Sequence, residues 1–127
     1  MSWVALVTVL ASAQFFVFGA LVSVARVKLN VPAPMMTGPA AFERINRVHL
    51  NTQERLVLFL PLLWLAAQSW PAAWVAGLGG VYLIGRLLYW RGYVNNPQAR
   101  TPGNIITMLP IGVLLLANLA TLVRGVL

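Results

Sequence analysis

The stretch Phe42 to Arg55, F-E-R-I-N-R-V-H-L-N-T-Q-E-R, decides the fold, because it runs directly into the apolar segment Leu56 to Leu65. It holds both acidic residues of the chain, three of its nine Lys and Arg residues, and its only His. Ionisable groups that continue into a membrane-type segment are costly and usually mark function. The sequence therefore places a candidate site on this helix.

Wound at about 100° per residue, the stretch gathers its polar side chains on one face of a helix. An arc of about 80° holds Glu43, Arg47, Asn51 and Glu54, and Arg44 and Arg55 widen it to about 120°. Arg47 could hold a carboxylate through a two-point fork, Glu54 could receive an ammonium group, and Asn51 could bond an amide. The arc predicts a pocket for a zwitterionic or anionic ligand.

The alternative is a solvated helix start with intrahelical pairs, in which Glu43 pairs with Arg47 and Glu54 with a nearby Arg. That alternative leaves the inner positions of Asn51, Glu54 and Arg55 unexplained, since they lie one to several turns inside the helix. His49 points about 160° away from Arg47, so by itself it is read as an ordinary helix residue.

The composition excludes several classes of protein. Of 127 residues, 60% are hydrophobic and only 9% are charged, against about 25% in soluble domains, so the chain is an integral membrane protein. The net charge of +7 comes from residues between apolar segments, which argues against nucleic-acid binding. With no Cys and one His, neither a disulfide nor a metal centre is expected, and any sulfur chemistry must come from a ligand.

The hydropathy pattern predicts one all-α domain, residues 1–127, built as a bundle of four transmembrane helices at about 3–25, 42–67, 72–94 and 104–123. The first run lacks the positive start of a signal peptide and is too long for one. Prolines exclude a continuous helix across 30–41, and a second loop is expected at 95–103. The short turn at 68–71 makes the second and third spans antiparallel neighbours.

Within the spans, Pro61 is expected to kink the second helix. The small pairs Ala73/Gly77 and Ala76/Gly80 are expected to let helices approach closely. Six cations lie on the side of the two long loops: Arg26, Lys28, Arg44, Arg47, Arg91 and Arg100. By the positive-inside rule those loops face the cytoplasm and both ends face outward.

A second cluster lies on the third span, where Tyr82, Arg86, Tyr89 and Tyr93 fall within an arc of about 60°. It is either a second wall of the pocket or a set of interfacial tyrosines with one snorkelling Arg. A single four-helix subunit offers little interior for such charges, so we expect the polar arcs of the second and third spans to meet at contacts between subunits.

Arg26 and Arg100 are either ordinary positive-inside anchors or additional cations at the cytoplasmic opening of the predicted pocket. In the second role they would favour a ligand thiolate over the thiol. Thr101, next to Arg100, could add a hydroxyl donor.

Two stretches resemble a known family. They are residues 25–54, A-R-V-K-L-N-V-P-A-P-M-M-T-G-P-A-A-F-E-R-I-N-R-V-H-L-N-T-Q-E, and residues 82–93, Y-L-I-G-R-L-L-Y-W-R-G-Y, followed by Arg100. With the four-span layout they resemble the membrane-associated proteins in eicosanoid and glutathione metabolism (MAPEG), and within that family a bacterial microsomal glutathione transferase or leukotriene synthase-like member. The resemblance covers nearly the whole chain.

The resemblance implies a homotrimer that binds glutathione as co-substrate between subunits, near the cytoplasmic face, and acts on a lipophilic electrophile or lipid hydroperoxide from the bilayer. It assigns glutathione binding to Arg26, Arg47, His49, Asn51, Glu54, Tyr89 and Tyr93. It assigns thiolate stabilisation to Arg100 and a structural or ligand-near position to Arg86. Glu43, from the polar arc, and Thr101, from its place beside Arg100, are further possible supporting residues. Short loops and the absence of Cys fit a bacterial inner-membrane protein whose active site faces the cytoplasm.

The chain departs from the family pattern at two positions. Arg55 stands where glutathione-conjugating members carry Tyr, and Val27 stands where they carry a second basic residue. The leading hypothesis is a glutathione transferase or peroxidase. The alternatives are a non-catalytic binding protein of the same fold, disfavoured by Arg100, and a small four-span exporter, disfavoured by the cation Arg47 beside Glu54.

Overall fold

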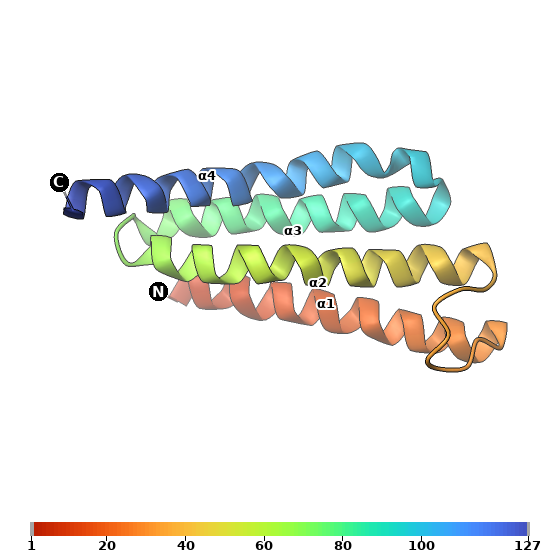
Figure 1. Cartoon of the computed structure of the whole chain (residues 1–127). Helices are drawn as coiled ribbons and strands as arrows, with labels where there is room; N and C mark the ends of the chain where they lie inside the picture. Colours follow the sequence, from red (N-terminus) through yellow and green to blue (C-terminus); the bar gives the residue numbers. More distant parts are fainter. Residues whose placement is uncertain (1, 127) are drawn as a thin grey trace.

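The computed structural model describes residues 2–126 as four long helices joined by short connections. They are α1 (Ser2–Leu29), α2 (Ala40–Ala67), α3 (Ala72–Asn95) and α4 (Thr101–Val126), with a short 3-10 helix, η1 (Pro97–Arg100), before α4. The helices run alongside one another, with the start of α1 and the end of α4 at one end of the bundle and the loop of residues 30–39 at the other (Figure 1). The predicted all-α bundle of four helices is confirmed.

Within residues 2–126, three helical segments are long and apolar enough to cross a membrane: Ser2–Leu29, Ala72–Asn95 and Pro97–Gly125, with mean hydropathies of 2.1, 1.3 and 2.2. The polar cluster in its first half keeps α2 below that level. Its 28 residues nevertheless extend about 42 Å, more than the roughly 30 Å of a hydrocarbon core, and it lies among the other helices (Figure 1). The protein is an integral membrane protein.

Several helix ends differ from the prediction. Helix α1 continues to Leu29 rather than ending near residue 25, because Arg26 and Lys28 suit the last turn of a helix. It stops at Asn30, which adopts a left-handed φ of 56°, a conformation that Asn tolerates. Helix α4 starts at Thr101 instead of 104, since Pro102 fits a first helical turn, where its missing N–H costs nothing. Helix α2 continues through Pro61, and the kink expected there stays a prediction.

The closest helix approach involves glycines other than those expected. A Cβ added to Gly77 or Gly80 would meet no atom within 4 Å in the described chain. A Cβ on Gly103 would instead lie 2.2 Å from the backbone nitrogen of Tyr89, and one on Gly85 would lie 2.6 Å from that of Thr107. The expectation for the Ala73/Gly77 and Ala76/Gly80 pairs is therefore wrong within one chain. The α3–α4 contact depends on Gly85 and Gly103.

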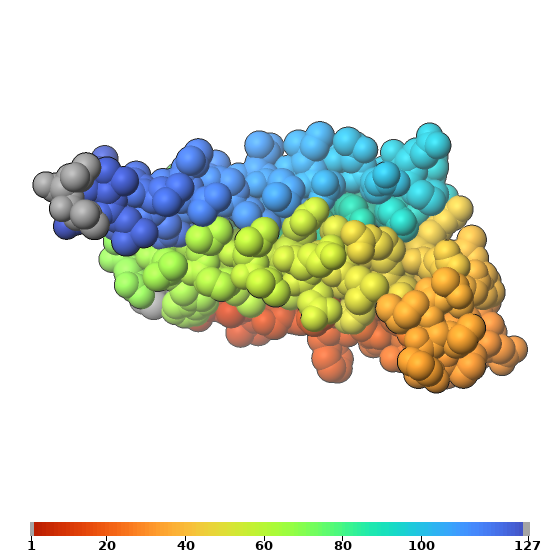
Figure 2. Space-filling view, viewed as in Figure 1, coloured from red at the N-terminus to blue at the C-terminus, as the bar shows by residue number. Residues whose placement is uncertain are grey.

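Two apolar clusters fill the bundle, one toward each end. In the cluster nearer the 68–71 turn, the rings of Phe59 and Tyr82 stack at 3.8 Å between centroids. The other, near the long loop, includes Phe18, Phe42 and Tyr89. On the face shown in Figure 2, α2 and α4 lie side by side, and the loop of residues 30–39 stands out at one end. The polar site lies where α2, α3 and α4 meet, toward the loop end.

Candidate functional site

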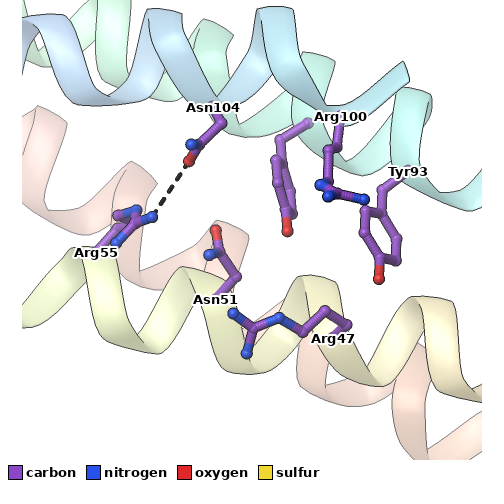
Figure 3. A pocket seen from close by; sticks show the side chains of 7 residues that line it. Arg47, Asn51, Arg55, Tyr93, Arg100 and Asn104 are labelled. Atoms are coloured by element: carbon purple, nitrogen blue, oxygen red, sulfur yellow. Dashed lines mark hydrogen bonds between the residues drawn. The ribbon is translucent and has the colours of Figure 1, made fainter. Parts of the chain in front are cut away.

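A polar pocket of about 360 Å³ lies between α2, α3 and the start of α4 (Figure 3). Its lining consists of Arg47, Asn51, Arg55, Tyr89, Tyr93, Arg100 and Asn104. Three guanidinium groups, two amides and two phenol rings face this space, and the lining includes no carboxylate. Such a composition suits a ligand that carries negative charge and several hydrogen-bond acceptors.

The structure brings together five of the residues predicted for the site. Arg47 and Asn51 come from α2, Tyr89 and Tyr93 from α3, and Arg100 from η1. The two tyrosine rings stack at 5.6 Å between centroids, so they form one wall. Helical spacing on α2 and α3 predicted these positions, since residues three or four apart share a face.

Glu54 lies beside the pocket and is paired with Arg47. Its Oε1 accepts a hydrogen bond from Arg47 Nη2 at 3.4 Å, and the two side chains are 54% and 45% exposed. An exposed pair of this kind contributes little to stability, so both groups can turn to a ligand at low cost.

Glu43 does not pair with Arg47, contrary to the alternative reading of the polar arc. Its Oε2 accepts a hydrogen bond from the Gly38 backbone N–H at 2.9 Å. Glu43 thus fastens the preceding loop to the first turn of α2, where a negative charge is favourable.

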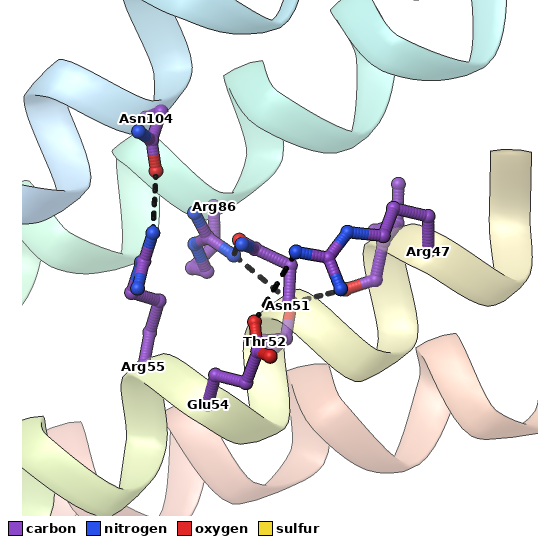
Figure 4. Close-up of polar contacts among 8 residues, drawn as sticks. Arg47, Asn51, Thr52, Glu54, Arg55, Arg86 and Asn104 are labelled. Carbon is purple, nitrogen blue, oxygen red and sulfur yellow. Dashed lines mark hydrogen bonds and ion pairs between the residues drawn. The ribbon is translucent and has the colours of Figure 1, made fainter.

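Arg86 is fully buried behind the pocket and joins α2, α3 and α4 (Figure 4). Its Nη1 donates to Asn51 Oδ1 at 2.7 Å and to Thr52 Oγ1 at 3.2 Å, and its Nε donates to Thr107 Oγ1 at 3.0 Å. Its guanidinium carbon also lies 4.5 Å from the centre of the Tyr89 ring. The expectation that one subunit is too small to hide this charge is wrong, because Gly85 lets α4 bring Thr107 close enough to bind it.

Arg26, His49 and Thr101 do not line the pocket of their own chain. Arg26 donates to the carbonyl oxygens of Val31 and Met35, at 3.4 and 2.7 Å, and so orders the 30–39 loop. His49 faces α1, where its ring stacks on Phe15 at 4.6 Å. The exposed Thr101 begins α4 outside the lining. The expected single mouth containing both Arg26 and Arg100 does not form within one chain.

Asn104 lines the pocket although sequence reasoning missed it, and Arg55, which the sequence places on the widened polar arc but assigns no role at the site, lines it as well. Arg55 Nη2 donates to Asn104 Oδ1 at 3.3 Å, which ties the middle of α2 to the first turn of α4. The available signal was position: Asn104 follows Arg100 by one helical turn, so the two share a face once α4 is known to start at Thr101.

Known proteins resemble this chain over most of its length. The uncharacterized protein sll1147 of Synechocystis is 39% identical over 120 residues, covering 94% of this chain and 88% of that protein. Mouse microsomal glutathione S-transferase 2 is 34% identical over 115 residues, covering 87% of this chain and 78% of the transferase. Bovine leukotriene C4 synthase is 42% identical over 76 residues, covering 60% of this chain and about half, 51%, of the synthase.

The family assignment agrees with the helical bundle and with the polar arcs on α2 and α3. Residues 4–120 match the MAPEG family, which leaves out only the extreme ends of the chain. The chain therefore belongs to the MAPEG family.

Proposed function

We propose that the protein is a glutathione-dependent membrane transferase, with a peroxidase reaction as a second use of the same thiolate. The observation that carries this proposal is the pocket itself, where three guanidinium groups and two amides surround about 360 Å³ beside a single carboxylate, Glu54. The volume lies in the range of small-ligand sites. Relatives named as a glutathione S-transferase and a leukotriene C4 synthase support the same class of reaction.

Glutathione matches the charges of the site. It carries two carboxylates and one ammonium group, and its thiolate form adds another negative charge. Arg47 would bind a carboxylate, and Glu54, 3.4 Å from Arg47, would turn to the ammonium group. Tyr89 and Tyr93 would offer phenol hydroxyls to the remaining acceptors.

Arg100 is the residue we assign to the sulfur. Its Nη1 donates to the Pro97 carbonyl oxygen at 3.1 Å, which leaves its other donors available at the pocket. A guanidinium beside a thiol favours the ionised form, which is the nucleophile. In transfer, the sulfur forms a bond to the electrophilic carbon while the bond to the leaving group breaks, and the thiol proton has passed to solvent.

In the peroxidase reaction the thiolate attacks the terminal oxygen of a lipid hydroperoxide, the O–O bond breaks, and glutathione sulfenic acid forms. The lipid alkoxide takes a proton from solvent and leaves as the alcohol. A second glutathione then displaces the sulfenic hydroxyl as water and completes the disulfide. Both reactions need a lipophilic partner that reaches the pocket from the bilayer. The exposed apolar side chains along α4, such as Ile105 and Leu109, line a path of that kind.

A homotrimer would complete the site. Arg26 and His49, which the family resemblance assigns to glutathione, lie on the α1 side of the chain, away from its own pocket. In a trimer with the ligand between subunits, these side chains would belong to the pocket of a neighbour. The thiolate side would face the cytoplasm of a bacterial cell, because the cations gather at the loop end.

The proposal is tested by turnover. Purified protein in detergent micelles is given glutathione and a lipophilic aryl chloride, and the conjugate is measured against a protein-free control. We expect saturable conjugation that the Arg47→Ala and Arg100→Ala variants reduce by at least about tenfold, the loss typical of one charged hydrogen bond. Conjugation no faster than in the protein-free control, with both aryl chloride and lipid hydroperoxide, would refute it.

A further inference from the structure

Arg86 is a buried cation without a carboxylate partner. None of its surface is exposed, and its acceptors are the neutral oxygens of Asn51, Thr52 and Thr107. Within residues 2–126 its Nη2 has no hydrogen-bond partner. A buried charge in this state is expensive, so its position between the pocket and the apolar core calls for a functional reason.

The bond to Arg86 decides which way the Asn51 amide points. Guanidinium groups only donate, so the atom 2.7 Å from Arg86 Nη1 must be the amide oxygen, and the NH2 group takes the other position. Within residues 2–126, Asn51 Nδ2 donates no hydrogen bond. It is nevertheless not one of the buried polar atoms that lack a partner, so it is not shut off from its surroundings. Asn51 lines the pocket, so this NH2 group is open to it.

We propose that Arg86 is a positioning residue that makes Asn51 a hydrogen-bond donor only. The glutathione group that meets Asn51 is then an acceptor, a carboxylate or a peptide carbonyl oxygen, and never a peptide N–H. This inference rests on the proposed function and adds the polarity of one contact to it. It also narrows the ligand groups that the sequence allowed at Asn51. An asparagine amide with no fixed orientation can either donate to a ligand oxygen or accept from a ligand N–H.

The charge of Arg86 reinforces the orientation. A cation on the oxygen of an amide draws electron density from its NH2 group, so hydrogen bonds in series strengthen one another at low dielectric. Arg86 thus acts on the ligand through Asn51 and does not touch it. Loss of Arg86 should therefore lower the glutathione affinity and raise the glutathione KM, with a smaller effect on kcat at saturation.

Three variants and a matched control separate positioning from packing. Arg86→Met keeps an unbranched apolar side chain in the space but frees the Asn51 amide to turn over. Arg86→Lys restores one charged donor to the Asn51 oxygen. Asn51→Asp keeps the acceptor for Arg86 and presents a second oxygen to the pocket where a donor is required. The control Thr107→Val removes the acceptor of Arg86 Nε and leaves Asn51 untouched.

The measurement is glutathione binding by calorimetry on detergent-purified protein, paired with the thermal midpoint and the glutathione KM. We expect R86M and N51D to weaken binding by at least about tenfold, R86K to recover most of it, and T107V to bind within about twofold of wild type. We also expect N51D to raise the midpoint without ligand, because it supplies the missing anion to Arg86.

Each contrary outcome has its own meaning. If R86M or N51D binds glutathione within twofold of the wild-type affinity, the inference is overturned and the proposed function stands. The same holds if the thermal midpoint of N51D lies below that of wild type. If T107V weakens binding as much as R86M does, the network only packs the helices, and the inference is again overturned. A wild-type protein that binds no glutathione overturns the proposed function and this inference together.

Discussion

At the scale of single residues, the site is a set of cations that the protein leaves largely uncompensated. Arg47 has an exposed partner in Glu54, Arg55 has the Asn104 amide, and Arg100 has a backbone carbonyl. Under the proposed function, an anionic ligand would supply the negative charge that these partners do not. Arg47 is held on the long helix α2, whereas Arg100 lies in the short helix η1, and the proposed function gives the two residues different roles.

This difference predicts that Arg100 and Arg47 fail in different ways. Arg100→Ala should leave glutathione affinity nearly unchanged while turnover falls, because the thiolate loses its cation. The ultraviolet thiolate absorbance of the bound complex should fall as well. Arg47→Ala should first raise the glutathione concentration needed for half-saturation. If R100A abolishes binding but keeps the thiolate signal per bound glutathione, Arg100 anchors a carboxylate and the assignment is wrong.

At the scale of the helices, the sequence predicted most of what positions the site. Helical spacing placed Arg47 with Asn51 and Tyr89 with Tyr93, and the structure brings both pairs to one pocket. The sequence could not predict that α4 contributes Asn104, because that contribution depends on how closely α3 and α4 approach each other. The approach depends on glycines 18 residues apart, Gly85 and Gly103, whose partnership only the three-dimensional packing reveals.

The same packing explains why Arg86 is buried within one chain and does not need the subunit contact that the sequence predicts. Hydroxyl groups from α2 and α4 supply its acceptors, and a single-helix pattern cannot show that Thr52 and Thr107 meet. The helix ends were missed by a few residues for a simpler reason. Cations and a proline that suit terminal turns were read as parts of loops.

Gly103→Ala tests the close approach of α3 and α4. The added Cβ would lie 2.2 Å from the Tyr89 backbone nitrogen, which cannot move as a side chain can, so the helices must separate. We expect a loss of about 1–3 kcal/mol, as for overpacked cores, together with weaker glutathione binding because Asn104 shifts. The measurement is the thermal midpoint in detergent.

Gly112→Ala on the same helix is the matched control. A Cβ at that position meets no described atom within 4 Å, so the better helix propensity of Ala should leave the midpoint unchanged or higher. Equal midpoints for G103A and G112A would show that the two helices do not approach as described.

At the scale of the whole molecule, the two ends of the bundle differ in charge, and this predicts the orientation. The chain has no cysteine, so single cysteines report one position each. Thr37→Cys in the long loop should resist a membrane-impermeant maleimide in intact cells and react after permeabilisation. Ser69→Cys in the opposite turn should react in intact cells. The reverse pattern would place the pocket on the outer side.

The trimer is the second prediction at this scale. If Arg26 and His49 complete a neighbouring pocket, glutathione binding and trimeric mass should appear together in mild detergent. Light scattering or native mass spectrometry measures the mass, and calorimetry measures binding on the same sample. A monomer with full glutathione affinity would show that one chain builds the whole site.

Equilibrium binding of glutathione to the purified wild-type protein shows whether the cationic pocket takes the proposed ligand. Calorimetry in detergent should give saturable binding that Arg47→Ala weakens by at least about tenfold, because a charged two-point contact is lost. The matched control is Lys28→Ala, which removes an exposed cation from the same end of the bundle and should bind as wild type does. No saturable binding to wild type, or equal affinity for wild type and R47A, would mean that this pocket is not a glutathione site.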